Sequence, residues 1–151
     1  MKPVLRNRLT PIRITAENFD SFSKWTTIKH MLEIGSPFVE CWGFMDKEGN
    51  RIGRQFLIKK GGTDGSHKIR NVDAYLCGVE IYESCRGNEY AGEMITWLFT
   101  RLHEEGIDDL YLSVNKNNYP ALRAYAKLGF EVVRSIFTVS LPKLSIPAHT
   151  L

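Results

Sequence analysis

The stretch VDAYLCGVEIYESCRGNEYAG, residues 72–92, joins a predicted strand to a predicted helix. Residues 72–82 combine β-branched, aromatic and apolar side chains, a composition that favours a strand. The turn CRGNEYAG (85–92) leads into apolar residues that recur at intervals of three and four, which predicts a helix ending near Gly106. The first turn of a helix has free backbone N–H groups and the positive end of the helix dipole. Because small residues before it let phosphate oxygens approach, the stretch predicts an anion site.

Glu89 lies in the centre of this predicted anion site, where a bound phosphate would meet a charge of its own sign. Two such charges 4 Å apart repel by about 1 kcal/mol in water and by several kcal/mol at the effective dielectric of a protein surface. Turning the Glu89 side chain toward solvent or toward Arg86 would relieve this repulsion. The turn by itself is also compatible with an ordinary strand-to-helix connection that has Gly87 at its bend.

The rest of the chain predicts an α/β protein with a mixed, mostly antiparallel sheet. Strands that follow one another directly pair antiparallel, whereas strands separated by a helix pair in parallel. The predicted elements are, in order, a strand at 11–15, a helix at 16–33 in one or two pieces, strands at 37–45 and 51–59, a mobile Gly-rich loop at 59–70, the strand at 72–82, the helix after the turn, a strand at 108–115, a helix at 117–129, one or two strands in 130–141 and an irregular tail from Pro142.

Length and composition predict one domain, residues 1–151, with a mildly basic surface. A formal charge of +3 tolerates anionic ligands but does not by itself indicate nucleic acid. The three cysteines, Cys41, Cys77 and Cys85, form neither a disulfide framework nor a metal-ligand pattern. No stretch has the roughly 20 apolar residues that span a bilayer, and no apolar region follows the basic N-terminus as in a signal peptide. We therefore expect a cytoplasmic protein without a metal and without membrane contact.

A second motif lies on the predicted helix at 117–129. It consists of Asn118, Ala121, Tyr125 and the pair Gly129-Phe130. The phosphate motif of the turn begins at Arg86 and ends at Ala91. Together, the two motifs resemble the GNAT superfamily of acetyl-CoA-dependent N-acyltransferases. The resemblance extends over residues 72–133 and implies the GNAT fold, whose central sheet has splayed parallel strands flanked by helices. The chain departs from the family pattern at Glu89, where the motif has its first glycine.

The resemblance implies that acetyl-CoA lies in the wedge between the splayed strands. The strand backbone at Val79, Ile81 and Tyr82 would pair with the pantetheine arm, and an N–H group near Ile81 would stabilise the oxyanion. The pyrophosphate would be held by the backbone amides of Arg86, Gly87, Asn88, Glu89, Tyr90, Ala91 and Gly92. Asn118 would contact the cofactor arm. Tyr125 would protonate the leaving thiolate, because a phenol with a pKa of about 10 can donate to a thiolate whose thiol has a pKa of about 8.5.

The acceptor implied by the resemblance is a primary amine that attacks the thioester directly, with the helix at 16–33 and the loop at 59–70 as its walls. Asp73, Glu80 and Glu83 are candidates for the general base, and water alone is a further one. In a regular strand Glu80 lies on the face opposite to Asp73. A bulge, which GNAT strands usually have here, would reset this alternation. Glu80 is therefore a candidate for the catalytic base.

Two other hypotheses remain compatible with the sequence. Glu89 could have ended cofactor use, which would leave a catalytically silent GNAT-fold binding protein. The loop at 59–70 could contact nucleic acid, or the 3′-phosphate of coenzyme A, through the cationic side chains of Lys59, Lys60, His67, Lys68 and Arg70. Nucleic acid is the less favoured partner, because the net charge is small. The sequence leaves the oligomeric state open, with a homodimer as one option.

Overall fold

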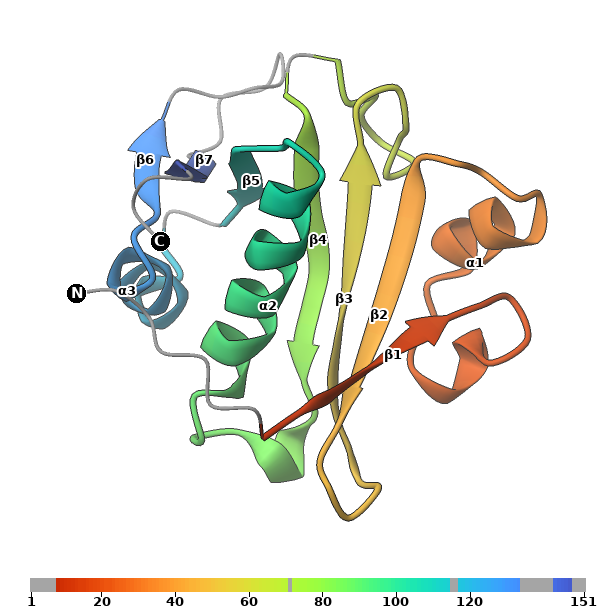
Figure 1. The fold of residues 1–151 in the computed structure, drawn as a ribbon, viewed down its shortest axis with the longest axis horizontal. Helices are drawn as coiled ribbons and strands as arrows, with labels where there is room; N and C mark the ends of the chain where they lie inside the picture. The colour runs from red at the N-terminus through yellow and green to blue at the C-terminus, as the bar shows by residue number, and fades with distance from the viewer. Residues whose placement is uncertain (1–7, 71, 115–116, 134–142, 148–151) are drawn as a thin grey trace.

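The computed structural model describes residues 8–70, 72–114, 117–133 and 143–147. Seven strands form one mixed sheet in the order β1-β2-β3-β4-β5-β7-β6 (Figure 1). The strands are β1 (Thr10–Ile14), β2 (Val39–Met45), β3 (Arg51–Lys59), β4 (Ala74–Ile81), β5 (Asp109–Ser113), β6 (Glu131–Val133) and β7 (Lys143–Pro147). The helices are η1 (Phe19–Ser21) and η2 (Glu83–Cys85), both 3₁₀, and α1 (Thr26–Glu33), α2 (Tyr90–Glu104) and α3 (Tyr119–Lys127). The predicted mixed α/β fold is confirmed.

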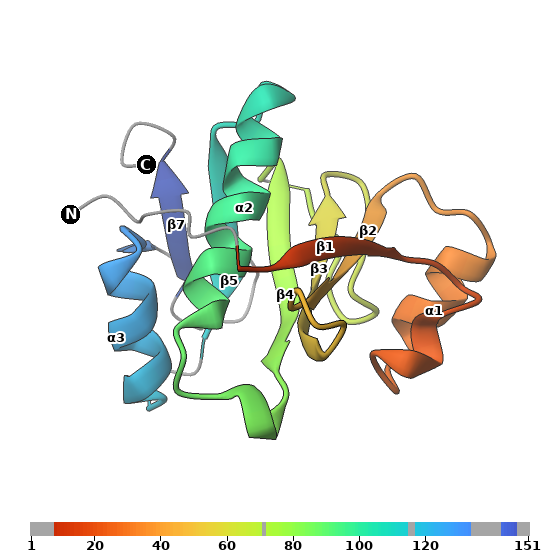
Figure 2. The same ribbon diagram turned by 60° about the horizontal axis from the view of Figure 1, so that its bottom comes forward.

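Alternation along the strands sends apolar side chains into two separate cores, one on each face of the sheet. On β3, Leu57 packs into the core that contains α2, whereas Phe56 and Ile58 pack into the core that contains η1 and α1. We call these the α2 face and the α1 face. Figures 1 and 2 show α2 beside β4 and β5, and α1 near β1 and β2 at the other side of the molecule. Apolar residues of α3 pack against the α2-face core.

The parallel strands β4 and β5 pair over a short distance and then separate. Their register includes only Tyr75 opposite Tyr111 and Leu76 opposite Leu112, both in the first half of β4. β4 continues to Ile81 and stays paired with β3 through Glu80 and Ile81. The second half of β4 therefore has a backbone edge without a register partner among the described residues of β5, which is the splay that the GNAT resemblance implies.

The helix predicted at 16–33, in one or two pieces, is in two pieces, η1 and α1. The loop at 59–70, expected to be mobile, folds as a small hairpin. Gly61 N donates to Ile69 O at 2.7 Å, and Ile69 N donates to Gly62 O at 2.8 Å. The Ile69 side chain is buried in the α1-face core, which explains why this Gly-rich segment has a defined conformation.

The expectation of an irregular tail from Pro142 was wrong. Residues Lys143–Pro147 form β7, which pairs antiparallel with both β5 and β6. Prolines at 142 and 147 suggested a loop, but proline is tolerated at strand ends, and Leu144 and Ile146 between them alternate as in a strand. Of the strands expected in 130–141, β6 covers Glu131–Val133, and the remaining positions lie outside the described residues.

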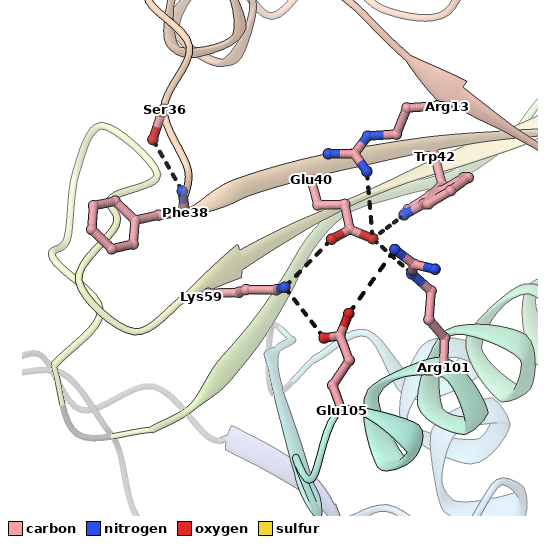
Figure 3. Close-up of polar contacts among 8 residues, drawn as sticks. All are labelled: Arg13, Ser36, Phe38, Glu40, Trp42, Lys59, Arg101 and Glu105. Carbon is pink, nitrogen blue, oxygen red and sulfur yellow. Dashed lines mark hydrogen bonds and ion pairs between the residues drawn. The ribbon is translucent and has the colours of Figure 1, made fainter.

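A buried carboxylate fixes the C-terminal half of α2 to the sheet (Figure 3). Glu40 on β2 accepts hydrogen bonds from Trp42 Nε1 at 2.7 Å and from Arg101 Nε, on α2, at 2.9 Å. Lys59 Nζ, at the end of β3, lies 3.5 Å from Glu40 and 3.3 Å from Glu105. Arg13 Nη1, on β1, lies 3.9 Å from the same carboxylate, so three strands and one helix meet there, and this contact sets the position of α2 over the sheet.

We expect Glu40→Gln to lower the free energy of unfolding by about 1.5–3 kcal/mol at neutral pH, because a buried carboxylate loses its charge-assisted hydrogen bonds from Arg101 and Trp42. Burial raises the pKa of Glu40, but hydrogen bonds from Trp42 and Arg101 and the charges of Arg101 and Arg13 outweigh it, so the pKa is lowered. Because the pKa of Glu40 is lower in the folded than in the unfolded state, the ionised carboxylate stabilises the fold at every pH above the unfolded-state pKa. This stabilisation is lost as the pH falls through the folded-state pKa. The difference in melting temperature between wild type and variant should therefore shrink in acid. Glu105→Gln, a change at an exposed partner, should cost less than about 1 kcal/mol, and an equal cost would contradict this account.

Candidate active site

A β-bulge interrupts β4 at the point where it leaves β5. Phe56 lies opposite Cys77 and Arg54 lies opposite Glu80, so Gly78 and Val79 together face the single residue between Arg54 and Phe56 on β3. Gly78 has a φ of +61°, the left-handed conformation that a G1 bulge requires. A Cβ atom at Gly78 would lie 2.4 Å from the Phe56 ring, so only glycine fits both the backbone and the space.

The bulge reverses which face of the sheet each later residue of β4 meets. Before it, Leu76 belongs to the α2-face core and Tyr75 to the α1-face core. After it, Val79 packs on the α2 face, and Glu80 contacts Arg54 on the α1 face. The predicted reset of alternation is confirmed, and it brings Glu80 to the same face as Tyr75.

Arg54 contacts both Glu80, the acidic candidate, and the backbone of the segment between η1 and α1. Arg54 Nη2 lies 2.7 Å from Glu80 Oε2, and Arg54 Nε donates to Phe22 O at 3.1 Å. Tyr82 donates its hydroxyl proton to the same Phe22 carbonyl at 2.9 Å. Phe22 lies between η1 and α1, so the predicted acceptor wall is attached to β4 directly beside the bulge. Glu80 is about half exposed, and Oε1 has no partner among the described residues.

The other two acidic candidates lie away from the bulge. Asp73 precedes β4 at its opposite end and is exposed. Glu83 is exposed in η2, after the strand has ended. Of the three carboxylates, Glu80 is the one that lies at the bulge and is held there by Arg54.

The turn before α2 holds a glutamate in a conformation that normally requires glycine. Glu89, the N-cap of α2, has a φ of 61° and is the one non-glycine residue with positive φ in the described part of the chain. The left-handed conformation costs roughly 1–2 kcal/mol for a residue with a Cβ. The turn has therefore kept the backbone shape of the glycine motif without the glycine. The Glu89 side chain is exposed, and Arg86 Nε donates to Ile81 O at 3.0 Å, which ties the turn to the end of β4.

An arginine from the N-terminal segment clamps this turn to the first turn of α2. Arg8 Nη2 donates to Asn88 O at 2.9 Å, and Arg8 Nε donates to Glu93 Oε1 at 2.9 Å. Its guanidinium also lies 4.4 Å above the Tyr90 ring. The side chain of Glu93 is 5% exposed. Sequence reasoning missed Arg8, although a buried acid in the first turn of α2 signals the need for a cationic partner.

The backbone around the turn fits an anion. The Glu89 side chain makes no capping hydrogen bond to the first turn of α2, so it does not occupy those N–H groups. A Cβ at Gly87 would meet no atom within 4 Å, which shows open space beside the turn. An open cavity of about 440 Å³ adjoins the turn on the side of the β2–β3 connection; Asp46 and Arg51 line it with Asn88 and Tyr90, so it is distinct from the edge of β4 that faces β5. Coenzyme A would find N–H donors for its pyrophosphate here and an open strand edge, beyond Leu76, for its pantetheine amides.

Asn118 and Tyr125 lie on α3 in the arrangement that the second motif predicts. Asn118 is the N-cap, and its Oδ1 accepts from Ala121 N at 3.3 Å. The Tyr125 ring packs edge-on against Phe130, with centroids 5.6 Å apart, and contacts the core that Val79 also contacts. Burial raises the pKa of Tyr125, so its phenol stays protonated at neutral pH. The Tyr125 hydroxyl makes no hydrogen bond to the residues that the structure describes.

A family of known proteins matches most of this chain. The family described as acetyltransferase (GNAT) family matches residues 13–130. The chain belongs to the GNAT acetyltransferase family. The matched region contains the bulge of β4, the turn before α2 and the Tyr125 helix, so the features described above lie within the GNAT portion. The resemblance inferred from the two motifs is confirmed.

Two curated relatives are mycothiol acetyltransferases. The one from Brachybacterium faecium is 37% identical over 60 residues, which cover 40% of this chain and 18% of that protein. The one from Corynebacterium aurimucosum is 35% identical over 60 residues, covering 40% of this chain and 19% of that protein. The chain thus spans less than a fifth of the length of these relatives.

Solved GNAT structures share the fold at low sequence identity. A spermidine N-acetyltransferase variant from Vibrio cholerae has a TM-score of 0.71 at 16% identity, with 95% of each chain covered. An acetyltransferase from Thermus thermophilus has a TM-score of 0.67 at 16% identity, covering 92% of this chain and 96% of that one. Because 92–95% of this chain is covered, these likenesses extend beyond residues 72–133, where the two motifs lie.

Two further structural observations bear on ligands and location. The described residues contain no cluster of three or more His, Cys, Asp or Glu side chains able to hold a metal ion. Within the same ranges, none of the helices has the length and apolar character needed to cross a bilayer.

Proposed function

We propose that this GNAT protein transfers an acetyl group from acetyl-CoA to a primary amine by direct attack within a ternary complex. The observation that carries the proposal is the bulged, splayed half of β4 leading into an uncapped helix N-terminus. These two features offer, on one continuous segment, donors for the pantetheine arm and for the pyrophosphate. Acetyl-CoA supplies a thioester whose acyl carbon is open to attack by an amine, with the thiolate of coenzyme A as the leaving group.

Each candidate residue has a distinct part in this proposal. The backbone of Val79 and Ile81 pairs with the pantetheine arm, and a strand N–H in this segment stabilises negative charge on the carbonyl oxygen. The Tyr82 N–H, which the resemblance also assigned to the arm, donates to Ile52 O of β3 at 3.0 Å and therefore does not face the arm. The amides of the turn, residues 86–92, hold the pyrophosphate, and Arg8 keeps that turn in place. Asn118 starts α3 next to the cofactor arm. Tyr125 donates its proton to the departing thiolate, which its raised pKa and protonated state support.

Glu80 is the residue that we propose to receive the amine. Its Oε2 is bound by Arg54, which fixes the carboxylate, while Oε1 remains available to accept a hydrogen bond from an incoming ammonium group. A carboxylate at this place attracts a cationic acceptor and can take its proton, directly or through water. The η1–α1 segment, attached through Phe22, forms the adjoining wall.

The acceptor class is supported by the relatives rather than by a pocket in this chain. A similar solved structure is a spermidine N-acetyltransferase, a name that specifies transfer to nitrogen, and the curated relatives are mycothiol acetyltransferases. We propose a small molecule or protein with an accessible primary amine. One spermidine N-acetyltransferase from Vibrio cholerae is dodecameric, and we propose that this chain also self-associates, with a homodimer as its smallest assembly. We further propose a cytoplasmic location, because its three cysteines are free thiols.

The nucleic-acid hypothesis loses support in the structure. Lys59, one of its five cations, is engaged with Glu40 and Glu105 (Figure 3). The hairpin at 60–70 packs toward α1, with Thr27 close to Gly65. The remaining cations are too few to make the extended basic surface that phosphate-backbone binding requires.

We test the proposal by following free thiol release from acetyl-CoA in the presence of a panel of primary amines, from polyamines to amino sugars and peptide N-termini. At least one amine should accelerate thiol release in proportion to enzyme concentration, and the acetylated amine should appear by mass spectrometry. Binding of coenzyme A without thiol release for any amine class would favour the catalytically silent alternative.

Removing the charge of Glu89 should tighten coenzyme A binding. We expect Glu89→Gln to lower the Kd by about fivefold, because relief of roughly 1 kcal/mol of repulsion corresponds to that factor. Glu89→Gly should lower the Kd similarly and also raise the melting temperature, because glycine adopts the left-handed conformation without strain. Calorimetric titration at low and high salt measures both effects, and high salt should reduce the difference. An unchanged Kd in both variants would show that the carboxylate points away from the phosphates.

A further inference from the structure

Arg54 makes a third contact that the proposed function does not use. Besides Glu80 and Phe22 O, its guanidinium donates from Nη1 to the carbonyl oxygen of Gly78, the bulge residue itself. Its side chain is 13% exposed, and its guanidinium lies 4.9 Å from the centre of the Phe56 ring. All three nitrogens of one rigid, planar group are therefore engaged, each with a different partner around the bulge.

The contact with Gly78 fixes the orientation of one peptide group. Arg54 extends from β3 and donates to the Gly78 carbonyl, so that oxygen is directed at the Arg54 guanidinium. In a trans peptide the following N–H points opposite to the carbonyl, and the described chain contains no cis peptide bond. The N–H of Val79 therefore points away from Arg54.

The opposite orientation of this peptide would place a carbonyl where an N–H is needed. Gly78 has no Cβ to hinder rotation, and a glycine can leave the left-handed conformation for other backbone conformations at little cost. Without a cation, the partly buried Gly78 carbonyl would lose its hydrogen-bond partner and the peptide would be free to turn. A carbonyl oxygen facing the thioester would repel the negative charge that develops during acyl transfer.

We propose that Arg54 is a positioning residue for acyl transfer: by binding the Gly78 carbonyl it aims the Val79 N–H at the developing oxyanion, and by binding Glu80 it holds the acceptor carboxylate at the bulge. This inference rests on the proposed function, since it names a residue that serves the same site. One side chain thereby couples the oxyanion donor to the group that receives the amine.

The variants Arg54→Lys and Arg54→Met test this inference. Loss of an oxyanion donor typically lowers kcat by about 10²–10³-fold, and we expect Arg54→Met to lower kcat at least about tenfold because the donor is misdirected rather than removed. KM for acetyl-CoA should stay within about threefold, because the phosphate turn is untouched. Arg54→Lys keeps the charge but has all its donors on one nitrogen, which cannot reach all three partners of the guanidinium, so it should recover only part of kcat. If Arg54→Met fails to fold, the kcat of Arg54→Lys relative to wild type decides the test.

A double-mutant cycle with Glu80→Gln separates the two contacts of Arg54. If Arg54 acted only through Glu80, then Arg54→Met would cause no further loss of kcat in the Glu80→Gln background. We expect a further loss of about tenfold, because the Gly78 contact is independent of the Glu80 charge. An absent further loss overturns the inference.

The matched control is Arg101→Met, which also removes an arginine that binds a carboxylate, at 2.9 Å, and stacks on an aromatic ring, at 5.0 Å. It lies on the far half of α2 and should change the melting temperature while leaving kcat within about threefold of wild type. A wild-type protein that binds no coenzyme A and acetylates no amine would end the proposed function. A wild type that turns over, with kcat in both Arg54 variants within about threefold of it, would overturn the role of Arg54 alone.

Discussion

Replacing Tyr125 with phenylalanine is expected to lower kcat by about 10²–10⁴-fold, the range that a positioned general acid contributes. The Kd for coenzyme A should change little, because the phenol ring stays in its contact with Phe130 and only the hydroxyl is lost. Steady-state kinetics and calorimetric titration of the same protein sample measure the two quantities. Full activity in the variant would remove Tyr125 as the proton donor.

The pH dependence provides a second measure of the same role. Burial raises the pKa of Tyr125, so the acid form persists at neutral pH and is lost only as the pH rises through this raised value. Wild-type kcat should therefore fall on the alkaline side, and Tyr125→Phe should lack that alkaline limb. Tyr119 is the matched control, because it lies on the same helix with 61% of its surface exposed. Tyr119→Phe should leave both kcat and its pH profile unchanged.

Replacing Gly78 with alanine is expected to remove the bulge and most of the activity together. The left-handed φ of +61° costs roughly 1–2 kcal/mol with a Cβ, and the overlap of that Cβ with Phe56 costs about 1–3 kcal/mol more. The strand can relieve both only by changing its backbone, which also turns the Val79 N–H. We expect a loss of about 3 kcal/mol in the free energy of unfolding and a fall in kcat of at least about 10²-fold.

Gly106→Ala separates backbone strain from the loss of the bulge. Gly106 also has a positive φ, of +81°, but its Cβ would meet no atom within 4 Å. That variant should lose only about 1–2 kcal/mol of stability and keep its kcat. Denaturant unfolding and initial rates measure both variants. Equal kcat in Gly78→Ala and wild type would show that the bulge has no part in the reaction.

The strongest local patterns in the sequence predicted the fold around the site. Residues 72–92 and the Asn118–Phe130 motif predicted the strand, the turn and two helices, because glycine placement and apolar periodicity are local signals. The splay of the parallel strands was expected only from the resemblance to the GNAT superfamily. The strand β7 was missed, because prolines flank a five-residue segment and its pairing with β5 and β6 is a long-range contact. A pattern read along the chain contains no information on such pairing.

Candidate side chains were predictable to a lesser extent than the backbone elements. Glu80 was singled out, but its face depended on a bulge whose position only the register with β3 reveals. Arg54 was overlooked, although an arginine within the largely apolar strand RIGRQFLIK needs a partner for its charge. Arg8 lies 80 residues from Asn88 in the chain, so no local signal connects them. The sequence also could not show that Glu89 keeps a glycine-like φ.

The central claim is that the bulged half of β4 and the turn at 86–92 form a working coenzyme A site despite Glu89. Calorimetric titration of the wild-type protein with coenzyme A, alongside thermal melting at the same ligand concentrations, tests it most directly. We predict saturable binding at one site per chain and a melting temperature that rises with ligand, because a ligand that binds only the folded state stabilises it. Absence of both binding heat and melting shift at millimolar coenzyme A would contradict the claim.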